Sequence, residues 1–123
     1  MAYLLDSNLL IYSALEAHEF LRPLTLNTQN FVSVISKVET MGFHSLDAAD
    51  AVYFQSLFAL VTLLPVTPDV IETAIRLWQQ RRMTLGDSLI AATALEFDLT
   101  LATRNVADFA PISKLTVFDP FQP

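Results

Sequence analysis

The sequence contains no cysteine, and it is poor in basic side chains. Among its 123 residues the absence of cysteine excludes disulfide bonds and thiolate zinc sites, and it suits a reducing cytoplasm. Lysine and arginine number 7 against 13 acidic residues, so the formal charge of −6 does not favour a nucleic-acid partner. An acidic protein can still bind nucleic acid where cations neutralise its carboxylates. The charge therefore neither supports nor excludes that class of function.

Long hydrophobic runs are also missing. The longest uncharged window, residues 51–68, is interrupted by Pro65 and Pro68 and predicts a buried helix followed by a strand rather than a membrane span. Only five residues precede Asp6, which leaves no room for a signal peptide before it. We therefore expect a soluble, cytoplasmic protein without membrane contact. An apolar content of 53% excludes a disordered chain, and the length predicts a single domain over residues 1–123.

What the sequence does contain is a regular alternation of strand and helix patterns. Short apolar, β-branched runs predict strands at residues 2–5, 31–35, 63–66, 99–103 and 115–118. Helical spacing predicts helices at residues 7–18, 36–41, 45–61, 68–82 and 87–97. This alternation predicts a three-layer α/β/α sandwich with a central, mostly parallel sheet of four to five strands.

Polar residues gather where these strands end. Asp6 follows the first strand, Glu39 lies four residues beyond the second, and Asp87 opens the helix before the fourth. Thr103, Arg104 and Asn105 stand at the end of the fourth strand, and Asp108 follows them. Ligands of open parallel sheets bind at the carboxyl ends of the strands, so we expect these oxygens at one edge of the sheet.

Each acid also has a purely structural explanation. Asp6 and Asp87 stand at expected helix N-caps, where an aspartate accepts a hydrogen bond from a free backbone N–H. Ser36 to Glu39 matches the capping box S-x-x-E, in which serine and glutamate satisfy orphan donors reciprocally. Asp108 could cap a turn. The case for a site depends on all four acids converging, because any one of them alone is explained by capping.

Converging carboxylates point to a metal ion. They raise each other's pKa unless a cation neutralises them. Ligation by oxygen alone favours Mg²⁺ or Mn²⁺ over zinc. Such an ion activates water and stabilises charge on phosphate, which suits phosphoryl chemistry.

At these residues the chain resembles the PIN-domain family, and within it the VapC-type toxins of toxin–antitoxin pairs. Three blocks carry the resemblance: L-L-D-S-N-L-L-I-Y at 4–12, V-S-V-I-S-K-V-E-T-M-G at 32–42, and L-G-D-S-L-I-A-A-T-A-L with L-A-T-R-N-V-A-D-F-A-P between 85 and 111. The resemblance implies an endoribonuclease that hydrolyses RNA phosphodiesters with metal-activated water.

Carried over to this chain, the family pattern implies a role for each acid. Asp6 and Asp87 would bind Mg²⁺ or Mn²⁺ directly, and Glu39 would act at the metal or through a bound water. Asn105 stands where many members have a fourth carboxylate, which puts a second metal in doubt while keeping Asn105 among the candidate catalytic residues. Asp108 could contribute on the same side, although a structural role in a turn explains it better.

Supporting roles fall to five further residues. Ser7 and Asn8 could hydrogen-bond the metal-bound carboxylates or could serve only to start a helix, and Thr103 could support the acids from its strand end. Arg104 and Lys37 are the nearest basic candidates for a phosphate contact, although Arg104 could equally pair with a carboxylate.

The resemblance also implies partners. They are an RNA substrate, a cognate antitoxin that covers the acidic groove, and a second copy in a homodimer. The sequence itself places more apolar surface on the helix at residues 45–61 than one face requires, at Tyr53, Phe54, Leu57, Phe58 and Val61. We interpret this surplus as a dimer or antitoxin contact.

Three other functions compete with this interpretation. A phosphatase of the haloacid-dehalogenase type also has an aspartate after its first strand, but it needs a second aspartate where this chain has Asn8. A catalytically silent PIN domain that binds RNA or protein is compatible with Asn105. A purely structural protein would not require the acids to converge.

Overall fold

Residues 2–122, the part that the computed structural model describes, contain a five-stranded parallel sheet. Its strands are β1 (Tyr3–Leu5), β2 (Phe31–Ser33), β3 (Thr62–Leu64), β4 (Thr100–Ala102) and β5 (Val117–Phe118). They lie side by side in the order β3-β2-β1-β4-β5, and every neighbouring pair is parallel. This arrangement confirms the predicted α/β class with a parallel sheet.

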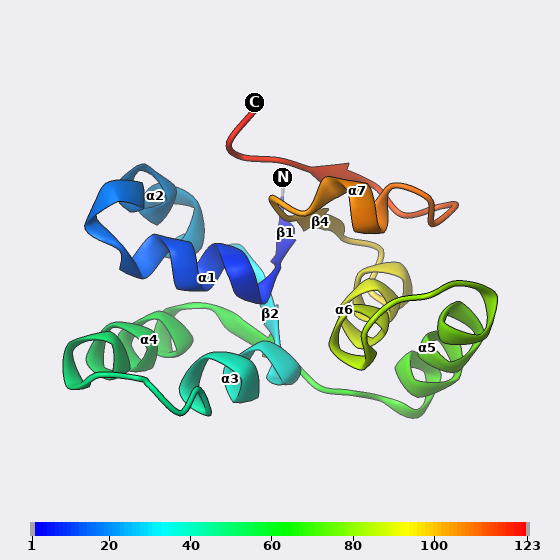
Figure 1. Ribbon diagram of the computed structural model, residues 1–123, viewed down its shortest axis with the longest axis horizontal. Helices are drawn as coiled ribbons and strands as arrows, with labels where there is room; N and C mark the ends of the chain where they lie inside the picture. The colour runs from blue at the N-terminus through cyan, green and yellow to red at the C-terminus, as the bar shows by residue number, and fades with distance from the viewer. Residues whose placement is uncertain (1, 123) are drawn as a thin grey trace.

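Helices cover both faces of this sheet (Figure 1). On one side lie α1 (Ser7–Ala14), the 3₁₀ helix η1 (Glu16–Leu21), α2 (Arg22–Thr25), α3 (Val34–Met41) and α4 (Ala48–Leu60). On the other side lie α5 (Pro68–Gln80) and α6 (Leu85–Glu96), and α7 (Val106–Phe109) packs near β4 and β5. The predicted three-layer α/β/α sandwich is therefore correct.

The sheet separates two hydrophobic cores. Successive strand residues point to opposite faces. Leu4 accordingly packs with the core beneath α5 and α6, whereas Leu5 packs with the core beneath α1 and α4, and both are fully buried. Burial on both faces explains why the strand reads as an uninterrupted apolar run rather than an alternating one.

The apolar face of α4 does not form the surplus surface that the sequence suggested. Phe54, Leu57, Phe58 and Val61 are buried in the core between α4 and the sheet. Tyr53 is half-buried, and its hydroxyl donates a hydrogen bond to Ser13 Oγ at 2.8 Å. The dimer or antitoxin contact inferred from these five residues is therefore wrong, because the protein's own core occupies that face.

Two helices begin earlier than predicted, and both shifts affect the acidic residues. Helix α3 begins at Val34, where Ser33 is the N-cap and accepts a hydrogen bond from the Ile35 amide. Helix α6 begins at Leu85, with Thr84 as its N-cap.

Across residues 2–122, no helix is both long and apolar enough to cross a membrane.

Candidate functional site

The candidate site lies where the strand order reverses. From β1 the chain proceeds to β2 and β3 on one side of the sheet, and β4 then pairs with the other side of β1. A crevice at such a switch point, outside the carboxyl ends of the strands, is where ligands of open parallel sheets bind. Leu5 pairs with Ala102 at this edge, so Asp6 and Thr103 emerge from adjacent strands.

Asp6 lies at this edge of the sheet, directly after β1. It occupies the N-cap position of α1, yet its carboxylate accepts no capping hydrogen bond. Its Oδ2 accepts instead a hydrogen bond of 2.8 Å from Thr103 Oγ1, and the residue is only 4% exposed. Asp6 therefore occupies the predicted N-cap position, but capping does not account for a carboxylate that is buried and hydrogen-bonded to Thr103.

Burial makes the Asp6 carboxylate costly to ionise. Its pKa is raised from 3.8 to about 6, mainly because burial removes water from the charged form. The charges of Asp87 and Glu39 raise the pKa as well, whereas the hydrogen bond from Thr103 lowers it. The structure thus places Asp87 and Glu39 close enough to Asp6 for their charges to raise its pKa.

Asp87 lies in the first turn of α6 rather than at its cap. The Asp87 amide donates to Thr84 Oγ1 at 3.0 Å, so Thr84 performs the capping that the sequence assigned to Asp87. Burial raises the pKa of the Asp87 carboxyl, the Thr84 hydroxyl lowers it, and the charges of Asp108 and Glu39 raise it. Asp87 is therefore half-buried in the first turn of α6, close enough to Asp108 and Glu39 for their charges to act on it.

Glu39 is held by serine hydroxyls. Its Oε1 accepts a hydrogen bond of 2.7 Å from Ser7 Oγ, and Ser7 Oγ also lies 2.8 Å from the buried Ser36 Oγ. Because Ser33 caps α3, Ser36 and Glu39 lie inside the helix and do not form the predicted capping box. Glu39 sits on the second turn of α3, one turn beyond Ser36 and on the same face.

Sequence patterns alone did not place Ser36 or Gly86 in the site around Glu39. Ser36 and Glu39 are three residues apart and therefore adjacent on a helix, a signal that the assumed capping box concealed. Gly86 lies against Glu39, since a Cβ added at Gly86 would be 2.8 Å from Glu39 Oε2. Without the fold, nothing in the sequence connects Gly86 to Glu39.

Asn105 and Asp108 form a pair at the start of α7. The Asn105 Nδ2 donates to Asp108 Oδ2 at 2.6 Å, and the Asn105 amide donates to Thr103 Oγ1 at 3.0 Å. Thr103 thereby connects Asn105 to Asp6. Asp108 both interacts with the Asn105 side chain and raises the pKa of Asp87, so its position combines a local structural contact with proximity to the acids.

The two basic candidates lie in different surroundings. The Arg104 guanidinium stacks over Phe121, with its Cζ 4.1 Å from the ring centroid. Arg104 also lines a depression of about 280 Å³ together with Asn8 and Asn105. No ion pair joins Arg104 to a carboxylate within residues 2–122. Lys37 instead lies on the side of α3 that faces α4, near Phe58, and it does not join the acids.

The acids offer oxygen ligands alone, which is the donor chemistry that a hard divalent cation prefers. In the described part of the chain, no three carboxylate or histidine side chains are grouped closely enough to hold one metal ion together. Nor does any described lysine or arginine form an ion pair with Asp6, Asp87 or Glu39. Mg²⁺ typically uses only one or two carboxylates together with water and substrate phosphate, so it does not require three grouped side chains.

Thr103→Val is expected to raise the pKa of Asp6 and to destabilise the protein. The substitution removes the donor to Asp6 and leaves the Asn105 amide without its acceptor, so it should cost about 1–3 kcal/mol in the free energy of unfolding. Urea denaturation and NMR titration of carboxyl carbons would measure both effects. Thr93→Val is the matched control, because the buried Thr93 hydroxyl bonds only Leu89 of its own helix. An unchanged Asp6 pKa in Thr103→Val would contradict this prediction.

Comparisons with known proteins point in one direction. The family model of the PIN domain matches residues 3–114. A chain of a toxin–antitoxin complex from Klebsiella pneumoniae is 28% identical, with a TM-score of 0.77 over 96% of this chain and 97% of that one. No curated protein sequence matches.

Two further solved structures share the fold at lower identity. They are FitAcB from Neisseria gonorrhoeae, 24% identical with a TM-score of 0.76 over the full length of both chains, and VapBC-1 from nontypeable Haemophilus influenzae. The latter is also 24% identical, with a TM-score of 0.77 over 97% of this chain and 98% of that one.

Proposed function

This chain belongs to the PIN-domain family, and on that premise we propose that it is a Mg²⁺- or Mn²⁺-dependent endoribonuclease and the toxin of a VapBC-type pair. We treat residues 1–123 as one PIN domain. The observation that carries the proposal is the Asp6 carboxylate, buried at the switch point beside Asp87 and Glu39 without a basic partner. An isolated buried carboxylate is unfavourable unless a cation or a proton compensates it.

In this proposal Asp6 and Asp87 hold the cation. When bound, the ion supplies a water nucleophile at neutral pH and stabilises charge on the phosphate. Thr103 fixes the orientation of the Asp6 carboxylate through its hydroxyl. Ser7 fixes that of Glu39, whose carboxylate orients the attacking water and accepts its proton. Asn105, tied to Asp108, offers an amide oxygen without a further negative charge.

The substrate side of the site is less acidic. Arg104, held over Phe121 and Tyr12 beside Asn8, is placed to contact an RNA phosphate or a nucleobase. Lys37 lies across α3 from the acids, so we assign it at most a peripheral contact with a longer RNA.

Partners and location complete the proposal. The Klebsiella relative is part of a toxin–antitoxin complex, which supports a cognate antitoxin for this chain as well. We also propose a homodimer and a cytoplasmic location. For the dimer, α5 offers Ile71, Ile75 and Trp78, which are exposed and follow helical spacing on its outer face. A monomer at micromolar concentration in sedimentation analysis would contradict the dimer.

Removal of the divalent metal is expected to stop cleavage of RNA. The protein, purified free of any antitoxin, is incubated with structured cellular RNA in Mg²⁺ or Mn²⁺, with chelator, and with the metal restored. We expect cleavage only where metal is present, because the acids have no other neutralising partner. The Asp6→Asn protein, purified in parallel, reports contaminating nuclease.

The main alternative is a silent PIN domain that binds RNA without cutting it. Asn105 in place of a fourth acid favours this alternative, as does the absence of any group of three metal-binding side chains among residues 2–122. RNA binding without metal-dependent cleavage would support it and contradict the nuclease. Membership of the PIN family disfavours the haloacid-dehalogenase alternative.

A further inference from the structure

The loop between α5 and α6 carries two arginines beside the acidic site. Arg81 follows the last residue of α5 and has extended backbone angles, φ −155° and ψ 157°. The basic pair Arg81–Arg82 therefore lies outside the helix in which the sequence placed it. Both side chains line a depression of about 430 Å³ that also includes Asp87 and Asp108. The loop thus brings two positive charges to the wall that the candidate metal ligand Asp87 shares.

Neither arginine has a charged partner in the described part of the chain. Arg81 and Arg82 form no ion pair with Asp87, Asp108 or any other described acid. The Nε of Arg81 is buried and has no hydrogen-bond partner. A buried donor left without a partner is costly, so an acceptor that binds there recovers the cost.

The position of the depression indicates which acceptor binds the arginines. It meets the acidic site at Asp87 and Asp108, whereas the depression of Arg104 meets the site at Asn8 and Asn105. A strand that passes over the acids would leave one depression and enter the other. Guanidinium groups match the oxygens of a phosphodiester bidentately, and they hold its charge next to carboxylates that a cation has neutralised.

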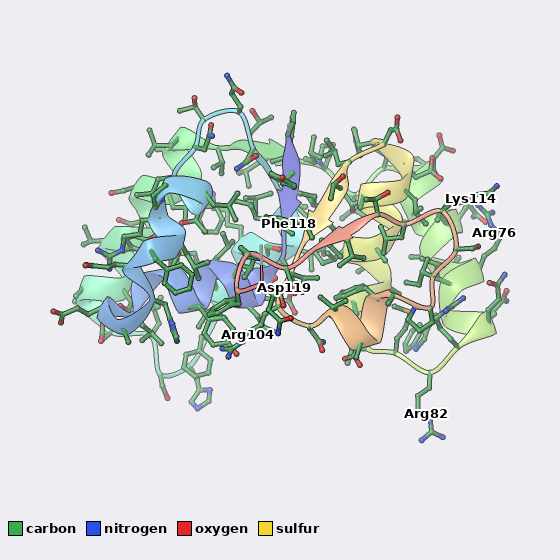
Figure 2. The ribbon with its side chains drawn as sticks, turned by 90° about the horizontal axis from the view of Figure 1, so that it is seen from above. Arg76, Arg82, Arg104, Lys114, Phe118 and Asp119 are labelled. Carbon is green, nitrogen blue, oxygen red and sulfur yellow. The ribbon has the colours of Figure 1, made fainter. Side chains whose placement is uncertain are left out.

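We propose that Arg81 and Arg82 form a subsite for an RNA phosphodiester that neighbours the cleaved one. This inference rests on the proposed nuclease function and adds the direction in which the substrate extends, from Asp87 toward the α5–α6 loop. In this subsite Arg81, which lines the depression, positions the phosphate. Arg82, which projects away from the body of the molecule, follows the strand outward (Figure 2).

The test compares Arg81→Gln and Arg82→Gln with Lys114→Gln. Lys114 is a charge-matched control, because it lies beside Thr100 at the start of β4, at the opposite edge of the sheet. The probe is a short single-stranded RNA with one mapped cleavage site, made also with an uncharged methylphosphonate at each phosphate near that site. Cleavage kinetics and RNA binding by fluorescence anisotropy are followed against salt concentration. Thermal unfolding checks that each variant folds.

We expect Arg81→Gln to raise KM for the RNA about tenfold or more, and each variant to lower the salt dependence of binding by about 0.7 in log–log slope. One methylphosphonate should reproduce the loss in wild type and add nothing further in Arg81→Gln. Lys114→Gln should leave KM, the salt dependence of binding and the effect of the methylphosphonate unchanged.

The outcomes separate this inference from the nuclease proposal. If wild type cleaves RNA and both arginine variants behave like Lys114→Gln, the subsite is wrong and the nuclease stands. If wild type binds RNA without cleaving it and Arg81→Gln weakens binding, the subsite stands and the nuclease is wrong. Absence of both cleavage and binding contradicts both proposals. Loss of affinity for a protein partner with unchanged RNA binding also overturns the subsite.

Discussion

Asp6→Asn is expected to stabilise the metal-free protein and to abolish RNA cleavage. The buried Asp6 has a pKa raised from 3.8 to about 6. Its ionisation at neutral pH therefore lowers the free energy of unfolding by about 3 kcal/mol. Asparagine keeps the acceptor for Thr103 but carries no charge, so it removes this cost. It also removes a metal ligand, and we expect cleavage to fall more than about 100-fold, beyond the loss typical of outer-sphere partners.

The raised pKa of Asp6 also predicts how the free energy of unfolding changes with pH. Because the folded pKa of Asp6 lies above its unfolded value, the stability it contributes is complete below pH 3.8 and is lost as the pH rises through about 6. Urea denaturation in chelator should therefore show wild type losing stability across this window relative to Asp6→Asn. Mg²⁺ at neutral pH should stabilise wild type but not the variant.

Asp87→Asn serves as the companion variant. It should abolish cleavage similarly, because it removes the other proposed ligand, but its effect on stability should be smaller since Asp87 is only half-buried. Equal stability of wild type and Asp6→Asn at neutral pH in chelator would contradict the cost assigned to the buried charge. Full activity of either variant would contradict its role as a ligand.

The sheet and its edge could be predicted from the sequence because strands buried on both faces leave an unambiguous signal. Leu4 and Leu5 must both be apolar, and the chain becomes polar at Asp6, where the strand ends. Parallel topology then follows from the alternation of strands and helices, and it brings the polar residues after β1, β2 and β4 to one edge.

Helix starts could not be predicted as well, because several residues within one turn can act as a cap. Ser33 and Ser36 both stand within one turn of the helix start, and only the fold selects Ser33 as the cap and places Ser36 against Ser7. Thr84 and Asp87 compete in the same way, and the threonine caps α6. In each case the local rule identified a competent residue, and tertiary packing decided which one performs the role.

The error on α4 has a different physical origin. Apolar residues at helical spacing show that a face is buried, but they do not say against what. Phe54, Leu57 and Phe58 pack on the protein's own sheet, because strands of only two or three residues leave much of the core to be filled by large helix side chains. An intermolecular interface and an internal core have the same periodicity, and only the fold distinguishes them.

Gly86→Ala is expected to reduce RNA cleavage about 10- to 100-fold while leaving the fold as stable as wild type or slightly more so. An added Cβ would lie 2.8 Å from Glu39 Oε2, so the Glu39 carboxylate must move and its hydrogen bond from Ser7 is disturbed. The moving atom is the end of a flexible side chain, which limits the cost of the clash. Alanine in a helix gains up to about 1 kcal/mol over glycine, and the loss of activity is of the size expected for a misplaced outer-sphere group.

Cleavage kinetics and urea denaturation would measure the two effects separately, and Gly42→Ala provides the control. The Cβ at Gly42 would lie 2.5 Å from the backbone carbonyl oxygen of Val38, which cannot move away easily. Gly42→Ala should therefore lose stability without a specific loss of catalysis in the molecules that remain folded. The same substitution at the two glycines of the chain should therefore have opposite effects: it lowers activity at Gly86 and stability at Gly42.

A double-mutant cycle connects the effect of Gly86→Ala to Glu39. Glu39→Gln removes the negative charge and proton acceptor, so it should lower the rate constant for cleavage by itself. If Gly86→Ala acts only by displacing the Glu39 carboxylate, it should add little further loss in the Glu39→Gln background. Additive losses would mean that Gly86 affects the site by another route, such as a shift of Asp87 in the same turn of α6. Wild-type activity in Gly86→Ala would mean that cleavage does not need Glu39 in the position that Ser7 holds.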